Sequence, residues 1–189
     1  MHGRARGEPP RGATMKSHPF AGGRHVLRLE PGDEVVASIT EFARRAKVAG
    51  GWFTGLGSLD RAVLGFLDPK EKVYLKRTFD ERMEIGSLSG NIAWNDDDPV
   101  VHVHAVLSPR ELLAYTGHLH EGTVAVVVEI LVTVLDGGLR RVVDPVTGFG
   151  RIVLPGDVQR NRGPGEAAQF GHTHEVFKLL EVHVRSLFA

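Results

Sequence analysis

The sequence predicts an α+β fold, with one early helix and many later strands. Two patterns carry this prediction. Apolar residues recur at helical spacing between residues 35 and 46, and β-branched and apolar runs follow from Trp52 to Val143. The chain has 189 residues, of which 42% are hydrophobic, and this is enough for one core. We therefore expect a single domain with short appendages.

The first 23 residues are rich in Gly, Pro and Arg and show no periodicity, which predicts a disordered basic leader over 1–23. Residues 1–28 hold six basic groups and one acid, although the whole chain is neutral, with 23 basic and 23 acidic residues. A basic leader thus precedes a mildly acidic body, and a start at Met15 would remove three of the basic residues.

The helix is the element with the strongest pattern, and a short strand at 25–29 precedes it. Asp33 is expected to be its N-cap, because a carboxylate there can accept hydrogen bonds from the open N–H groups of the first turn. Apolar residues at helical spacing then run from Val35 to Ala46, and Gly50 and Gly51 are expected to stop the helix.

The rest of the body is predicted as strands joined by turns. Asp68-Pro69 and Asp136-Gly137-Gly138 are expected to be turns, the second joining a hairpin, and residues 96–99 a solvated loop. Gly55 and Gly57 belong to no nucleotide-binding motif and are expected to allow a bend or close packing. After a linker at 155–169, residues 170–188 favour a helix. The predicted strands cover residues 63–67, 72–76, 83–92, 100–107, 123–135 and 139–143.

Composition excludes several classes of protein. The chain has no cysteine, so disulfides, thiolate zinc sites and cysteine nucleophiles are absent, which fits a reducing compartment. No apolar run approaches the ~20 residues that span a bilayer, and the N-terminus lacks the apolar core of a signal peptide. The balanced charge argues against a generic nucleic-acid coat. We expect a soluble, cytoplasmic protein that has no membrane partner.

The spacing of the histidines indicates a metal site. Six of the ten fall into three His-x-His pairs: His102/His104, His118/His120 and His172/His174. In a strand, residues two apart point to the same face with Cα atoms roughly 6.5–7 Å apart, so two imidazoles can converge on one ion. A pair from one strand and a histidine from its neighbour would supply three nitrogens of an open zinc site.

The predicted metal ligands are therefore His102, His104 and His118, for zinc or another divalent ion. Glu84, Glu121 and His120 are the accessory candidates, since a carboxylate that accepts from an imidazole fixes its tautomer. A His-x-His pair in a β protein is also common as an exposed or hydrogen-bonded pair without an ion, and this alternative stays open. His172 and His174 fall in a segment that favours a helix, where residues two apart do not share a face, so no metal is expected there.

Five segments, in this order and spacing, resemble a known family, the PPC domain conserved between plants and prokaryotes. They are Gly55–Leu59, Met83–Ile92, His102–Ala105, Gly117–Leu119 and Arg141–Phe149. The resemblance runs from about Arg24 to Leu154, so it implies a PPC-like domain at 24–154 and leaves 155–189 as a linker and C-terminal extension.

The resemblance implies a strongly bent mixed β-sheet packed with a helix, and assembly as a homotrimer. Some members of the family carry a histidine-bound metal, and the corresponding positions here are His102, His104 and His118. Glu84 matches a family carboxylate near that site. In plants the domain accompanies AT-hook segments, and on that analogy the prokaryotic members are regarded as DNA-binding proteins.

An AT-hook inserts the arginines of a short Arg-Gly-Arg-Pro core into the minor groove. The leader differs from this core, because Ala5 replaces the central glycine and Glu8 adds a negative charge. Its candidate DNA contacts are Arg4, Arg6 and Arg11.

We expect a PPC-like homotrimeric binding protein with a histidine metal site, more a binding module than an enzyme, whose partners are copies of itself and DNA or another protein. The alternative is a hydrolase-like, metal-dependent enzyme in which Glu84 acts as general base. Another is sequence-tolerant DNA binding through the leader, which a chain starting at Met15 would lack. A cupin barrel is a rival at the level of the fold, but Glu111 is out of position for it and the helix after Asp33 argues against it.

Overall fold

The computed structural model describes residues 15–144, 148–154 and 157, and the chain divides into two compact units, Met1–Val153 and Leu154–Ala189. In the second unit, the Leu154 N–H donates to Asp157 Oδ2 and the Asp157 N–H donates to the Leu154 carbonyl, both at 3.0 Å. The predictions for Arg4, Arg6 and Arg11, for the linker apart from Asp157, and for the helix at 170–188 with His172 and His174 fall outside the described residues.

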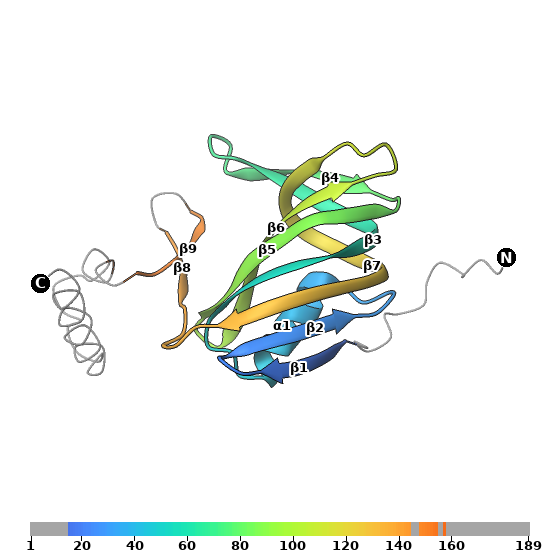
Figure 1. Ribbon diagram of the computed structural model, residues 1–189. Helices are drawn as coiled ribbons and strands as arrows, with labels where there is room; N and C mark the ends of the chain where they lie inside the picture. Colours follow the sequence, from blue (N-terminus) through green and yellow to red (C-terminus); the bar gives the residue numbers. More distant parts are fainter. Residues whose placement is uncertain (1–14, 145–147, 155–156, 158–189) are drawn as a thin grey trace, which may run out of the picture. The chain divides into compact units, whose positions relative to one another are not determined.

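The first unit holds one helix and nine strands within its described residues (Figure 1). The helix is α1 (Val35–Arg45). The strands are β1 (Lys16–Phe20), β2 (Arg24–Leu29), β3 (Gly51–Asp68), β4 (Val73–Phe79), β5 (Met83–Asn95), β6 (Asp98–Ser108), β7 (Tyr115–Val134), β8 (Arg141–Val143) and β9 (Gly150–Ile152).

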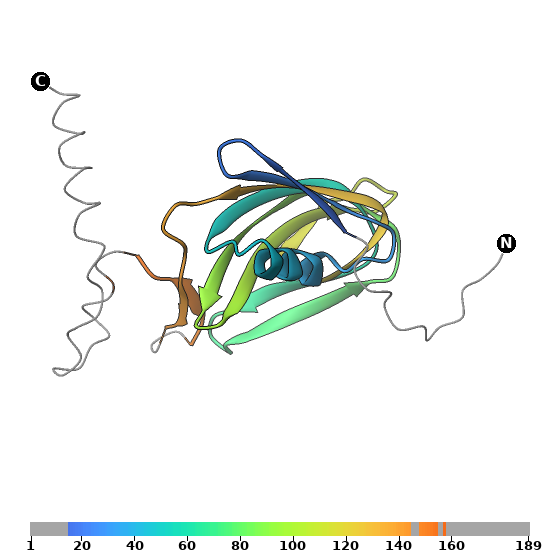
Figure 2. The same ribbon diagram turned by 90° about the horizontal axis from the view of Figure 1, so that it is seen from below.

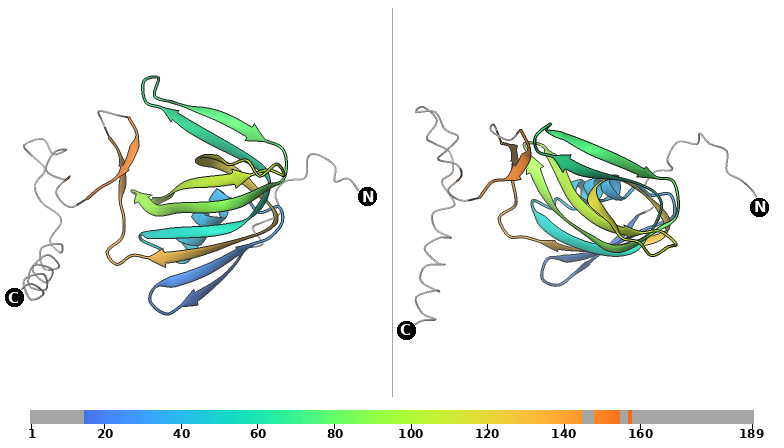
Figure 3. Two further views of the ribbon diagram at one scale, coloured as in Figure 1. Left: turned by 45° about the horizontal axis from the view of Figure 1, so that its top comes forward. Right: turned by 90° about the horizontal axis from the view of Figure 1, so that it is seen from above.

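Seven strands form one sheet in the order β1-β2-β7-β6-β5-β3-β4, and β7 also pairs with β3. Strands β3, β5, β6 and β7 are thereby joined in a ring, while β1 and β4 lie at the two ends of the order (Figure 3). Every pairing between these strands is antiparallel, so the prediction of a mixed sheet is wrong. Short turns join β3 to β4 and β5 to β6, and strands joined by such turns pair antiparallel.

Strands β3 and β7 are much longer than the sequence predicts, with 18 and 20 residues. Each changes partner along its length: the first half of β3 lies between β5 and β7, and its second half between β4 and β7. Gly57 stands at a register shift with φ +142°, and a Cβ there would lie 2.2 Å from the Val127 carbonyl oxygen. This confirms that a glycine serves a bend and close backbone packing here.

The helix begins one residue later than expected and is capped by Glu34, not Asp33. Glu34 Oε2 accepts from the Ala37 N–H, whereas Asp33 Oδ2 accepts from the Glu30 N–H at 3.0 Å and closes the preceding turn. At its other end the helix stops at Arg45, before Gly50, because Lys47 adopts φ +52°.

The core lies where the sheet curves around α1 (Figure 2). The buried stripe of α1, which includes Val35, Ile39 and Phe42, packs with the apolar residues of the strands in one cluster. We call the sheet face toward this core the inner face and the opposite one the outer face. In β6, buried residues at 103, 105 and 107 alternate with His102 and His104, which therefore belong to the outer face.

Two parts of the chain differ from the predicted organisation. Residues 16–20, which their composition places in the basic leader, form strand β1, because their backbone pairs along its whole length with residues 24–28 of β2. Residues 136–138 do turn, with positive φ at both glycines, but they do not join a hairpin: β8 pairs with β9, a strand that the sequence analysis did not predict. Among the described residues, no helix is long and apolar enough to cross a bilayer.

Candidate metal centre

Strand register brings the predicted histidines together in two neighbouring rows on the outer face. In one row Trp52 lies opposite Asn91, which lies opposite His102. In the next row Ser89 lies opposite His104, which in turn lies opposite His118. Because directly paired residues share a face, this register alone makes His102, His104 and His118 neighbours.

The three imidazoles point toward one another. Their ring centroids are 5.2 Å (His102–His104), 5.1 Å (His102–His118) and 5.6 Å (His104–His118) apart. One nitrogen from each ring can be chosen so that all three lie within 4.8 Å of one another. His104 is exposed and the other two are half-buried, so the group is open to solvent on one side.

His120 extends the group without joining the set of three. Its ring centroid lies 4.7 Å from that of His118 and 4.9 Å from that of Tyr74 in β4. The pairing of β7 with β3 shifts between Leu119 and Glu121, so His120 sits in a β-bulge. His118 Nδ1 and His120 Nε2 are both buried and have no hydrogen-bond partner within the described part of the chain.

The cluster favours neutral imidazoles. Burial, and then the neighbouring His102, lower the pKa of His118 to about 4. Burial is also the main cause that lowers the pKa of His102, followed by the charge of Arg141, and burial with Lys76 lowers that of His120. At neutral pH these rings therefore keep the lone pairs that a metal ion needs.

Arg141 on β8 contacts the cluster from its buried side. It is only 9% exposed, and its Nη2 donates to Asn91 Oδ1 at 2.9 Å and lies 3.3 Å from His102 Nδ1. Because a guanidinium only donates, His102 Nδ1 must accept, and the proton of the neutral ring is then on Nε2. His102 can thus bind an ion through Nε2 only after Arg141 releases Nδ1.

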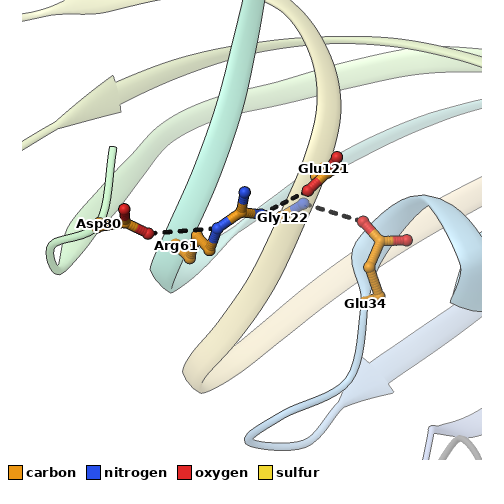
Figure 4. Close-up of polar contacts among 5 residues, drawn as sticks. All are labelled: Glu34, Arg61, Asp80, Glu121 and Gly122. Atoms are coloured by element: carbon orange, nitrogen blue, oxygen red, sulfur yellow. Dashed lines mark hydrogen bonds and ion pairs between the residues drawn. The ribbon is translucent and has the colours of Figure 1, made fainter. Parts of the chain in front are cut away.

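The two predicted carboxylates are not brought to the three imidazoles. Glu84 lies opposite Ser108, four residues along β6 from His104, a separation of roughly 13 Å at about 3.3 Å per residue. Glu121 accepts a short hydrogen bond from Arg61, which also pairs with Asp80 at 3.3 Å (Figure 4). Glu121 is therefore engaged by Arg61, and it acts on the neighbouring His120 through its charge.

The residue types in this cluster are those that bind a divalent metal ion. Three imidazoles from adjacent strands are a common zinc ligand set, and nitrogens on one tetrahedral ion lie about 3.3 Å apart, which small side-chain rotations would reach from the present spacing. The buried, unpaired His118 Nδ1 is an atom that an ion could satisfy. The Arg141–His102 contact and the positive charge of Lys76 near His118 and His120 oppose a bound cation.

Sequence reasoning missed three residues that surround the histidines, namely Trp52, Asn91 and Arg141. Asn91 and Arg141 stand in the segments that carry the family resemblance, but their spacing of 50 residues signals no contact. The exposed Trp52 had no signal of its own, because only the register of β3 with β5 places it beside Asn91.

Fold and site together define a domain in which a curved antiparallel sheet surrounds one helix and carries a histidine cluster on its outer face. The chain belongs to the Plants and Prokaryotes Conserved (PCC) domain family, whose profile matches residues 17–136. This confirms the resemblance seen in the sequence. No curated protein matches the chain.

Solved structures share the fold. A Bacteroides thetaiotaomicron protein is similar with a TM-score of 0.70 and 24% identity, over 76% of this chain and 98% of that one. A protein from Ralstonia eutropha JMP134, described as a "putative DNA-binding protein", has a TM-score of 0.69 and 28% identity, over 74% of this chain and 96% of that one. A metal-containing protein from Archaeoglobus fulgidus has a TM-score of 0.65 and 29% identity, over 70% and 94%.

Proposed function

We propose that this chain is a cytoplasmic, homotrimeric binding protein that holds a divalent ion, zinc in the first instance, on His102, His104 and His118. The observation that carries the proposal is the convergence of three ring nitrogens within 4.8 Å of one another from two paired strands. The metal-containing relative from Archaeoglobus fulgidus supports it. When bound, such an ion offers a strong positive charge and an open position for a ligand.

Metal analysis of the purified protein tests this proposal. We expect about one ion per chain in the wild type and a large loss in His104→Ala, since a site with two imidazoles binds far more weakly. His18→Ala is the matched control, because His18 is an exposed histidine on β1, far along the sheet order from β6. A metal-free wild-type protein, or full metal content in His104→Ala, contradicts the proposed site.

The homotrimer is supported by the family and by apolar surface at the end of the β3–β4 hairpin. Phe66 and Leu75 lie directly opposite each other and are 69% and 59% exposed. Val73, two residues from Leu75, is 49% exposed. Exposed apolar pairs of this kind are the surfaces that subunit contacts cover.

The mass of the protein in solution tests the assembly. We expect a particle with three times the mass of the chain, and dissociation when a charge is placed in the hairpin by Leu75→Asp. Glu71→Lys, in the adjoining turn, is the control, because it changes charge without touching the apolar pair. A monomeric wild-type protein would contradict the proposed homotrimer.

DNA is the partner that we propose for the assembly, on the support of the Ralstonia eutropha relative and of the basic leader. Contacts of arginines with phosphates release counterions, so the affinity for an A·T-rich duplex should fall steeply with salt. A chain starting at Met15 lacks Arg4, Arg6 and Arg11 and should bind more weakly. Equal affinity with and without the leader would contradict its role.

We do not extend the proposal to the hydrolase-like alternative. That mechanism needs a general base within hydrogen-bond reach of the reacting water. The roughly 13 Å along β6 that separates Glu84 from His104 leaves this carboxylate outside that reach. The pocket beside the histidines has no carboxylate among its lining residues.

A further inference from the structure

A pocket of about 160 Å³ opens beside the histidines on the outer face. It is lined by Trp52, Ser89, Gly90, Asn91, His102 and His104. Two of the three proposed metal ligands thus form part of its wall, and the half-exposed indole of Trp52 forms another part. Any ligand in this pocket would meet both the ion and a flat apolar surface.

The surroundings of the pocket carry an uncompensated positive charge. Arg141 is 91% buried, its Nη1 donates to the Gly150 carbonyl at 2.8 Å, and its Nε has no partner in the described part of the chain. No carboxylate among the described residues forms an ion pair with it. Because buried charges are normally paired, and because three neutral imidazoles leave the charge of a divalent ion intact, this site favours an anion.

Arg141 also decides which end of Asn91 faces the pocket. A guanidinium only donates, so the atom of Asn91 at 2.9 Å from Nη2 must be its carbonyl oxygen. The amide NH₂ of Asn91 is then the group left to a ligand, and the exposed Ser89 hydroxyl stands in the neighbouring row. The polar wall of the pocket can therefore donate hydrogen bonds, as an oxyanion requires.

We propose that this pocket binds a small aromatic carboxylate, with the carboxylate at the open position of the ion and beside the Asn91 amide, and the ring against Trp52. The inference rests on the proposed metal site. Arg141 acts as a positioning residue, because it orients Asn91 and supplies buried positive charge without lining the pocket.

Calorimetry on the full chain tests this inference, with zinc added first and benzoate, acetate or inorganic phosphate second. We expect one benzoate per zinc-loaded chain, bound about tenfold more tightly than acetate or phosphate, because a ring stacked on an indole contributes about that factor. Trp52→Leu should lower the affinity for benzoate to that for acetate and leave the affinity for acetate unchanged. Trp94→Phe is the matched control, since the Trp94 indole donates to the Val48 carbonyl away from this pocket.

Two further variants test the contributions of the Arg141 charge and the Asn91 amide separately from that of the Trp52 ring. Asn91→Leu should lower the affinities for benzoate and for acetate about tenfold while zinc still binds. Arg141→Met should lower the affinity for benzoate, because Asn91 loses the donor that orients it. It should not lower the affinity for zinc, because it also removes the donor that competes for His102 Nδ1. Zinc binding without any benzoate binding, benzoate binding that Trp52→Leu and Asn91→Leu leave unchanged, or tighter binding of phosphate overturns this inference alone. Failure to bind zinc in the first titration overturns the proposed function with it.

Discussion

Glu34 and Gly122 are 88 residues apart in the chain and are joined by a hydrogen bond of 2.9 Å from the Gly122 N–H to Glu34 Oε1 (Figure 4). The other carboxylate oxygen of Glu34 accepts from the Ala37 N–H and caps α1. One side chain thus fixes the start of the helix and anchors it to β7. This side chain is one of the contacts that hold α1 in the curve of the sheet, beside the backbone hydrogen bond from the Val124 N–H to the Asp33 carbonyl.

Replacing this carboxylate should cost more than the loss of an ordinary cap. We expect Glu34→Ala to lower the free energy of unfolding by about 2 kcal/mol, because the cap and the partner of the buried Gly122 N–H are lost together. Urea unfolding measures the change. Glu41 lies on the exposed side of the same helix and forms an ion pair with Arg45, so Glu41→Ala should change stability by less than about 0.5 kcal/mol. Equal effects of the two variants would contradict the anchoring role.

Among the described residues Phe42 is the largest fully buried side chain, and it lies between α1 and the sheet, with its ring centroid 5.2 Å from that of His25. Phe42→Ala should destabilise the protein by about 4 kcal/mol, because it leaves a cavity in the core. Leu112→Ala is the comparison, since this leucine is 83% exposed and loses little buried area. A small loss for Phe42→Ala in chemical denaturation would show that the core is not built around α1.

Stability of the metal-free protein should fall on acidification. The pKa of His118 is lowered from 6.5 to about 4 in the folded state. Between these two pH values His118 is therefore protonated in the unfolded chain and neutral in the folded chain. The free energy of unfolding is then highest above pH 6.5 and decreases as the pH falls toward about 4. His102 and His120 shift in the same direction. Urea unfolding in the presence of a chelator, at a series of pH values in this window, measures the slope, and His118→Gln should flatten it. A slope unchanged by His118→Gln contradicts the assignment.

Gly57 should tolerate no side chain. At φ +142° and with the Val127 carbonyl oxygen 2.2 Å from the position of a Cβ, Gly57→Ala should destabilise the fold by about 3 kcal/mol. Gly86→Ala is the matched control in β5, since the nearest atom to its Cβ would be 3.7 Å away and its φ is ordinary. Thermal unfolding of the two variants should therefore separate them clearly.

The elements with an uninterrupted period could be predicted from the sequence. The stripe from Val35 to Ala46 predicted α1, and the alternation around His102 and His104 predicted both β6 and the convergence of the histidines. Strands β3 and β7 were underestimated because register shifts, such as the one at Gly57, break the period on which a prediction depends. Strand β1, at one end of the sheet order, is not predicted because its side chains are all exposed, so no apolar pattern marks it.

The surroundings of the histidines were less predictable than the histidines themselves. A two-residue spacing within one strand has a geometric meaning, whereas the contact of Arg141 with Asn91 depends on how β8 packs beside β5. The same holds for the carboxylates. Glu121 adjoins His120 in sequence, but Arg61, 60 residues away, holds it.

Strand β7 pairs with β2, β3 and β6, and three of the other strands complete a ring with it. No member of such a ring can separate from one neighbour without straining the others. Hydrogen exchange should therefore divide the backbone into two groups: amides in the middle of β7 exchange only when the whole unit unfolds, while those of β1 and β4, which have a partner on one side only, exchange through local fraying.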